Sequence, residues 1–183
     1  MKKFYEIIFV VVFILTCNNV FAFDGERKGF ILGGGIGGGF LSNTVSASSF
    51  SLTESEGVFA TNFKIGYAPS NTLEIYYISK VSWWGESDVI FTVGLSAVAV
   101  TYYFNDTSET GWFASGGVAL SSLDAPFEED LSADYGFGLF GGGGYEFAAH
   151  WSVEVDLLYS AIKESGADFD SFGVLLSINF LAF

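Results

Sequence analysis

The chain has 183 residues, half of them hydrophobic, and its 21 acidic against 7 basic side chains give a formal net charge of −14. This length suits one domain rather than two. The charge argues against nucleic acid as a partner, because phosphate binding requires a basic surface. The single cysteine excludes an intramolecular disulfide and a cysteine-based zinc site, and we expect no cofactor.

Residues 1–22 predict a cleavable secretory signal peptide. Two lysines precede an apolar run that is too short to span a bilayer comfortably, and Val20 and Ala22 fit the −3 and −1 positions of a cleavage site. An uncleaved anchor helix and a lipoprotein site at Cys17 are the alternatives. We expect an exported mature domain of residues 23–183.

The mature chain is hydrophobic but contains no apolar run long enough for a transmembrane helix. The nearest candidate is residues 89–104, which are uncharged, rich in valine and tyrosine, and interrupted by Gly94. The length of this segment and its β-branched residues favour a strand. A hydrophobic exported chain without spanning helices indicates a β-barrel, because a closed barrel also satisfies the backbone hydrogen bonds inside lipid.

Alternation of apolar residues with small or polar ones predicts eight β-strands. We expect them at residues 29–41, 57–68, 72–83, 89–104, 111–122, 135–147, 151–160 and 171–183. The long connections are residues 42–56, 84–88, 123–134 and 161–170, and the short ones are residues 69–71, 105–110 and 148–150. This order predicts an all-β, eight-stranded antiparallel up-and-down transmembrane barrel, with the short turns and both termini on the periplasmic side.

The first expected strand has a run of glycines on one face. Gly33, Gly35, Gly37 and Gly39 share one face, and Phe30, Leu32, Ile36 and Phe40 lie on the other. A phosphate-binding loop would need a following Lys-Ser/Thr pair and a strand-to-helix context, which the run lacks. We interpret these glycines as facing a crowded barrel interior.

The hairpin of residues 135–159 has aromatic residues at both ends of its apolar face. Tyr135 and Tyr159 lie at the open end, and Tyr145, Phe147 and Trp151 lie near the turn. At roughly 3.3 Å per residue and roughly 40° of tilt, the two bands are on the order of 25 Å apart. This separation matches the hydrocarbon thickness of an outer membrane, so we expect these residues to form aromatic girdles.

Periodicity defines two faces of each strand but does not say which face is inside. A secreted soluble barrel of lipocalin type would bury the apolar face and expose the charged one. We favour the membrane barrel because the charged face is largely glycine and alanine, which suits a crowded lumen, and because the aromatic residues are banded. Along residues 89–104 the contrast is too weak to assign the faces.

Six charged side chains are predicted to face the lumen: Lys64, Glu74, Lys80, Glu146, Glu154 and Asp156. Folding the hairpin about residues 148–150 places Glu146 opposite Glu154, which is repulsive unless a cation lies near both. Lys64 is the expected partner. We therefore predict a buried ion network that plugs the lumen, with solvated charges in a wet interior as the alternative.

The end of the chain resembles the terminal strand of bacterial outer-membrane proteins. Its outward residues are Phe172, Val174, Leu176, Ile178 and Phe180, and the last residue is Phe183. Residues 28–183 as a whole resemble the small eight-stranded outer-membrane barrel family of the OmpA transmembrane-domain and OmpX type. Phe183 departs from the alternation, so we expect residues 181–183 either to extend past the barrel or to follow a bulge.

This resemblance implies a location in the cell outer membrane. It also implies contact with the lipid bilayer and lipopolysaccharide, and recognition of the closing strand by the barrel-assembly machinery through Phe183. It is specific for architecture and unspecific for activity.

His150 and Ser152 form an H-x-S pair that resembles the motif of outer-membrane lipid A deacylases, in which a nearby acid completes a triad. Val153 stands where that family has asparagine. The predicted topology also puts His150 in a periplasmic turn, away from lipid A in the outer leaflet. We interpret His150 as a turn residue.

The predicted external loops contain twelve carboxylates against one cation, Lys163. We interpret this charge as a hydrated, repulsive surface that can meet a surface ligand; calcium near Asp168 and Asp170 is the alternative, although no EF-hand-like spacing is present. Our prediction is a structural or surface-interaction protein without catalysis. A narrow porin-like channel is the alternative, and a lipid A-modifying hydrolase is a remote one.

Overall fold

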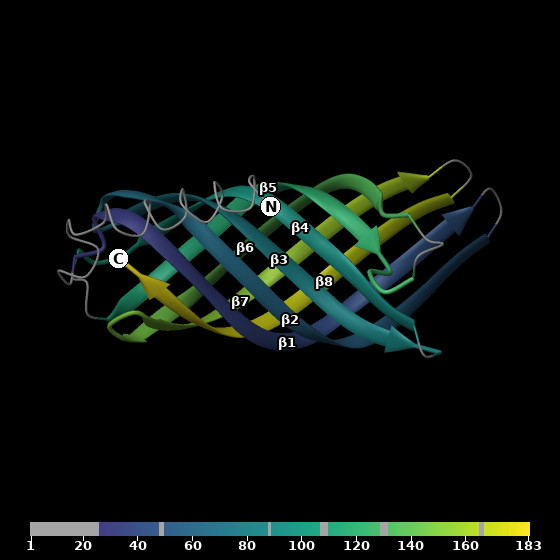
Figure 1. Ribbon diagram of the computed structural model, residues 1–183, viewed down its shortest axis with the longest axis horizontal. Coiled ribbons are helices and arrows are strands. Elements are labelled where there is room, and N and C mark those ends of the chain that lie inside the picture. Colours follow the sequence, from purple (N-terminus) through teal and green to yellow (C-terminus); the bar gives the residue numbers. More distant parts are fainter. Residues whose placement is uncertain (1–25, 48–49, 88, 107–109, 129–131, 165–166) are drawn as a thin grey trace, which may run out of the picture.

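Eight antiparallel strands close into a single barrel in the computed structural model (Figure 1), which describes residues 26–47, 50–87, 89–106, 110–128, 132–164 and 167–183. The strands are β1 Gly29–Ala47, β2 Phe50–Ser70, β3 Leu73–Glu86, β4 Val89–Tyr103, β5 Gly111–Asp124, β6 Asp134–Ala148, β7 Trp151–Glu164 and β8 Ala167–Ala182. Each strand pairs with the next in the chain, and β1 pairs with β8. The predicted all-β up-and-down fold is therefore confirmed.

The predicted signal peptide lies outside the described residues. In the part of the chain that the structure describes, no helix is long and apolar enough to cross a membrane.

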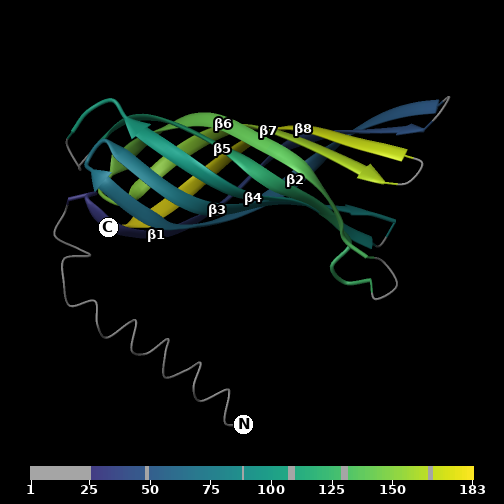
Figure 2. The same cartoon turned by 90° about the horizontal axis from the view of Figure 1, so that it is seen from above.

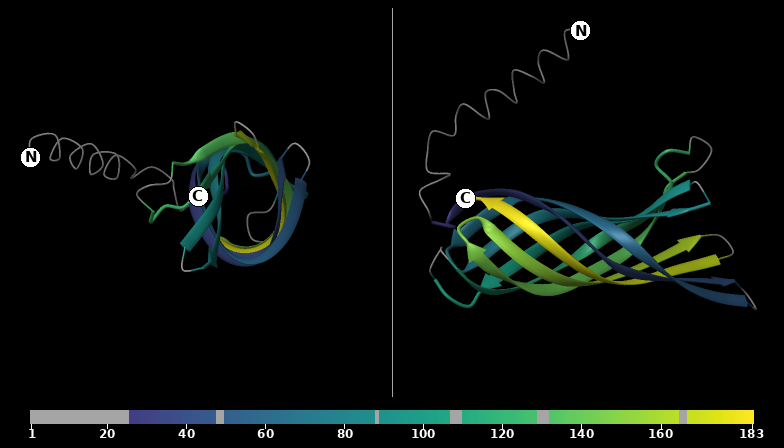
Figure 3. Two further views of the ribbon diagram at one scale, coloured as in Figure 1. Left: turned by 90° about the vertical axis from the view of Figure 1, so that its right-hand side faces the viewer. Right: turned by 90° about the horizontal axis from the view of Figure 1, so that it is seen from below.

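The two ends of the barrel differ. The short β2–β3 and β6–β7 turns and the C-terminus gather at one end, which we call the turn end, and the β1–β2 and β7–β8 hairpins project beyond the barrel at the other, the hairpin end (Figures 1 and 2). Viewed from the hairpin end, the strands form a ring (Figure 3). The expected sorting of the connections to the two ends is thus observed.

Three predicted long loops are largely strand, and in one of them, residues 84–88, β3 continues as far as Glu86. β1 and β2 remain paired as far as Ala47 and Phe50, and β7 and β8 pair as far as Glu164 and Ala167. Polar composition suggested loops, but the hydroxyl groups of facing residues hydrogen-bond across the β1–β2 ladder, at 2.9 Å in the Thr44–Thr53 pair. The prediction of loops over residues 42–56 and 161–170 is therefore wrong, because a polar strand does not need a buried face.

The apolar face of the sheet points outward. Phe40 in the middle of β1 is 71% exposed, and Val98 in the middle of β4 is 65% exposed. Trp112, at the turn end of β5, is 66% exposed. On β4, whose faces the sequence left unassigned, Val98 and its even-numbered neighbours are exposed, whereas Leu95 and Ala97 are buried. This arrangement excludes the lipocalin-type alternative, which requires the apolar face inside.

Glycines make room for interior side chains at two places. A Cβ atom on Gly35 would collide with the side-chain oxygen of Asn179, and one on Gly144 would collide with the Phe113 ring. Both glycines belong to the inward face of their strands. The predicted crowding of the interior therefore holds at these positions.

The C-terminal residue lies inside the barrel. β8 pairs with both neighbours without a register shift, and its odd-numbered residues point inward throughout. Phe183 continues that parity and is only 2% exposed, with its ring centroid 4.5 Å from that of His150. Both expectations for residues 181–183, extension past the barrel and a bulge, are wrong, because the aromatic ring fills the turn end instead of facing outward.

We expect Val98→Arg to lower the unfolding free energy of the barrel in lipid vesicles by roughly 2–4 kcal/mol, since a cation near the middle of the outward face must leave water. Denaturant unfolding followed by tryptophan fluorescence measures the change. Ser55→Arg, on the outward face of the β1–β2 hairpin, is the control and should change little. Equal stability of wild type and Val98→Arg would mean that the outward face meets water.

Candidate functional site

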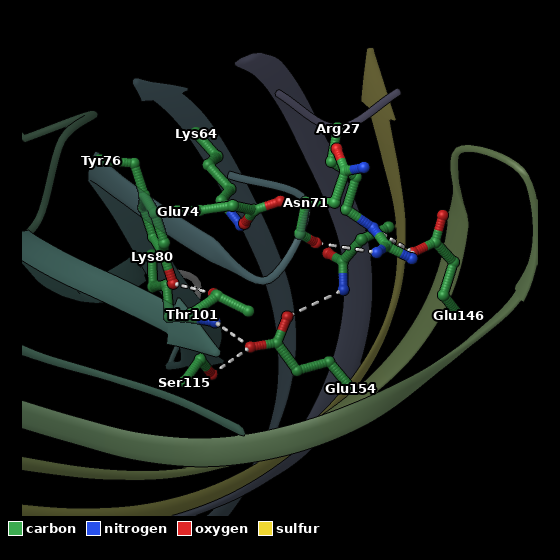
Figure 4. Close-up of polar contacts among 11 residues, drawn as sticks. Arg27, Lys64, Asn71, Glu74, Tyr76, Lys80, Thr101, Ser115, Glu146 and Glu154 are labelled. Atoms are coloured by element: carbon green, nitrogen blue, oxygen red, sulfur yellow. Dashed lines mark hydrogen bonds and ion pairs between the residues drawn. The ribbon is translucent and has the colours of Figure 1, made fainter. Parts of the chain in front are cut away.

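Three cationic and four acidic side chains lie inside the barrel, and Figure 4 labels all of them except Asp156. The cations are Arg27, Lys64 and Lys80, and the carboxylates are Glu74, Glu146, Glu154 and Asp156. Six of them occupy inward-facing positions on β2, β3, β6 and β7. Arg27 enters the barrel from the segment before β1. All seven are shielded from solvent, and Arg27 and Glu74 are fully buried.

Arg27 holds the turn end together. Its Nε and Nη2 donate to one carboxylate oxygen of Glu146 at 3.0 and 2.6 Å, and its Nη1 donates to the backbone carbonyl of Asn71 at 3.1 Å. The guanidinium also lies over the Tyr103 ring, 3.7 Å from its centroid. A planar guanidinium suits these simultaneous contacts better than an ammonium would. One side chain thereby joins the N-terminal segment, the β2–β3 turn, β4 and β6.

Lys64 pairs with Glu74 on the neighbouring strand. Its Nζ donates to the carboxylate at 2.5 Å and lies 3.9 Å from the centroid of the Tyr76 ring. The Tyr76 hydroxyl is in turn 2.8 Å from that of Thr101 on β4. The buried Lys64 ammonium therefore has an opposite charge and an aromatic face beside it, and both offset its desolvation.

Lys80 crosses the barrel from β3 to β7. Its Nζ lies 2.5 Å from a carboxylate oxygen of Asp156 and 3.7 Å from one of Glu154. Glu154 also accepts hydrogen bonds from Ser115 at 2.9 Å and from the Asn179 amide at 3.2 Å. Opposite walls of the barrel are thus joined by charge-assisted hydrogen bonds, which are stronger than neutral ones.

The predicted pairing of Glu146 with Glu154 is wrong. Glu146 lies opposite Ser152, and Glu154 lies opposite Gly144. β6 continues to Ala148, and a register shift precedes the turn, so the hairpin folds one residue earlier than predicted. Lys64 is accordingly not the cation of Glu146. The two carboxylates have separate partners, Arg27 and Lys80.

Sequence patterns missed Arg27 and the uncharged part of the site. Arg27 precedes the first strand, so alternation assigns it no face. Asn62 donates to Asn179 at 2.8 Å, and Asn179 donates to Glu154. Alternation predicts that both asparagines face inward. Their contact could not be predicted, because they are 117 residues apart in the chain and meet only when the barrel closes.

The predicted girdle residues occupy both ends of the outward face. Tyr135 is 62% exposed toward the hairpin end, where Tyr159 donates a hydrogen bond to Asp170 at 3.1 Å. At the turn end, the Tyr145 and Trp112 rings are 4.9 Å apart, and Trp151 packs against Phe180 at 5.2 Å. Phe147 is half exposed beside them. Their role as membrane girdles stays a prediction.

His150 and Ser152 belong to the turn end. His150 has a φ of 70° in the β6–β7 turn, and its Nδ1 is 2.9 Å from the Leu181 carbonyl oxygen. Both residues border a cavity of about 30 Å³. Such a volume holds about two water molecules and no fatty acyl chain. The geometry therefore supports the structural role of His150 that we favoured.

Within the described residues, no group of three or more His, Cys, Asp or Glu side chains is arranged to hold a metal ion. Asp170 instead accepts the hydrogen bond from Tyr159. The alternative of a calcium site near Asp168 and Asp170 thus has no support from the described residues.

We expect Lys64→Met to lower the unfolding free energy by about 3 kcal/mol, because it leaves the fully buried Glu74 carboxylate without its cation. The temperature at which the folded barrel loses its fast gel mobility should fall. Lys64→Met/Glu74→Met should recover most of the loss, and the exposed Lys163→Met is the matched control. An unchanged temperature in Lys64→Met would argue for a wet interior.

No protein-family model and no curated protein matches the chain in sequence. Among solved structures, Neisserial surface protein A is similar with a TM-score of 0.52 and 15% identity, over 84% of this chain and 97% of that one. Ail, the attachment invasion locus protein of Yersinia pestis, gives 0.47 and 11%, over 84% and 99%. The outer membrane enzyme PagL gives 0.44 and 13%, over 76% and 97%. At such identities the likeness concerns architecture alone. The chain has the fold of the small eight-stranded outer-membrane β-barrels.

Proposed function

We propose that this protein resides in the bacterial outer membrane as a closed barrel with a structural or surface-interaction role and no catalysis. The observation that supports this function best is the interior. Ion pairs join its walls, and the cavity beside them has a volume of only about 30 Å³. A lumen filled in this way holds the barrel together and leaves no path for a solute.

The outward face supports the membrane location. Its apolar residues surround the barrel, and the exposed aromatic residues of the β6–β7 hairpin lie toward its two ends. Lipid satisfies such a surface, and lipopolysaccharide would surround it in the outer leaflet. By the usual relation between connection length and side, the turn end and both termini face the periplasm, and the hairpin end faces outward.

The closing strand is the expected contact for the barrel-assembly machinery. The last outward aromatic side chain of β8 is Phe180, whereas Phe183 is buried inside the finished barrel. We therefore expect recognition through Phe183 to precede closure of β8 against β1.

In this proposal the absence of catalysis follows from the chemistry at the turn end. The His150 ring contacts the C-terminal segment, and Ser152 faces Glu146 across the ladder. A lipid A substrate would have to reach these residues from the opposite leaflet. The surface role is instead assigned to the hairpin end, where exposed carboxylates such as Glu54 and Glu86 gather.

We expect the protein to fractionate with outer membranes, to show heat-modifiable gel mobility, and to produce no discrete conductance steps in planar bilayers. The ion-paired interior is the reason, since ions need a continuous wet path. Lys80→Ala/Asp156→Ala should open measurable steps if its fold is retained. Steps in the wild type would favour the narrow-channel alternative, and recovery in the soluble periplasm would contradict the membrane location.

Replacing residues 125–133 by a short Gly-Ser linker should reduce attachment of bacteria that carry the protein to host-cell layers. These residues join β5 to β6 at the hairpin end, outside the closed sheet. A scrambled segment of equal composition is the control for charge, and gel mobility verifies folding. Unaltered attachment would leave the protein with a structural role only.

A further inference from the structure

The barrel interior opens into an apolar cup at the hairpin end, with a cavity volume of about 170 Å³. Its floor comes from four strands: Trp84 on β3, Phe91 on β4, Leu123 on β5 and Phe169 on β8. The Trp84 and Phe91 rings stack with centroids 5.8 Å apart at 24°. These side chains belong to or pack against a cluster of buried apolar residues, and its members Val93 on β4 and Leu158 on β7 form an apolar layer between the cup and the ion pairs along their strands. The cup is therefore a closed-bottomed recess with an aromatic floor.

The rim of the cup is acidic. Glu54 and Glu56 lie on the inner face of β2, and Glu86 lies on that of β3. The β2–β3 ladder ends at the Phe59 and Trp83 pair, and Glu56 and Glu86 each lie three residues beyond that end. Carboxylates that line one recess repel each other unless a cation lies near them. Among the described residues that line the cup, none is Lys, Arg or His.

We propose that the cup binds a small organic cation with an apolar body, such as an aromatic ammonium compound. The Trp84 and Phe91 rings attract a cation to their faces and bury an apolar group, and the three carboxylates select positive charge. A cavity of about 150 Å³ is large enough for one benzene ring, so the ligand is of that size. An anion would meet three negative charges without a counter-ion.

The apolar layer and the ion pairs below the floor stop this ligand from crossing the barrel. The cup is thus a capture site and not the entrance of a channel. The inference rests on the proposed function only for the side of the membrane that the cup faces, and binding to the purified protein does not depend on that side.

Isothermal titration of the full folded chain in non-ionic micelles with benzyltrimethylammonium chloride at low ionic strength tests the proposal, with empty micelles as the blank. We expect saturable binding. Benzyl alcohol, which is similar in size but neutral, should bind at least about tenfold more weakly, because it lacks the attraction of the carboxylates. Benzoate should show no saturable heat.

Two charge-matched variants locate the site. Glu54→Gln/Glu56→Gln/Glu86→Gln should weaken binding of benzyltrimethylammonium roughly tenfold. Glu128→Gln/Asp168→Asn/Asp170→Asn, which removes the same charge outside the cup, should bind like the wild type. Phe91→Ala should also weaken binding, and gel mobility verifies that each variant is folded.

Three results would overturn the inference: no saturable binding by the wild type, equal affinity for benzyl alcohol, or equal weakening in the two charge variants. The last would assign the effect to net charge alone. A soluble or conducting protein would instead contradict the proposed function and leave these titrations interpretable.

Discussion

Closure of the sheet is the constraint on which the rest of the structure depends. The β1–β8 ladder extends from the Leu32 and Ala182 pair to the Ser46 and Asp168 pair without a shift, so every strand has two hydrogen-bonded neighbours. Closure also fixes which parity of each strand faces inward. A slip of one residue in any ladder would exchange the faces and place charges on the apolar surface. The ladder therefore determines both the outer surface and the contents of the lumen.

The buried charges complement this closure. Arg27 and Glu146 are 119 residues apart in the chain, and Lys80 and Asp156 are 76 apart, so these contacts exist only when the correct strands surround the lumen. Burying ions costs desolvation free energy. Ion pairing offsets this cost but adds little net stability. A slipped barrel would retain that cost and lose the pairing. The ion pairs thus make the native register more stable than a slipped register. A uniformly apolar interior would distinguish the two registers poorly.

The sequence was informative where a signal is local. Alternation predicted all eight strands and the facing of residues such as Lys64 and Glu74, because parity is a property of each strand alone. It failed where a feature depends on partners. The register of Glu146 depends on a shift beside the β6–β7 turn, and the role of Arg27 depends on a carboxylate on a distant strand. Phe183 has the inward parity of β8, although we expected residues 181–183 either to extend past the barrel or to follow a bulge.

Charge divides the interior into two functional levels. The lower level contains three cations and four carboxylates, and every cation there already has a carboxylate within hydrogen-bonding distance. The upper level contains the carboxylates of the cup, and the apolar layer between the levels keeps the cations away from them. Among the described residues of the two levels, every lysine and arginine side chain already pairs with a carboxylate, so an anion would find no cation that is still available. The negative field of the cup attracts cations over a distance. The solute that binds there is therefore positively charged. The apolar floor selects the cations that also have an apolar group.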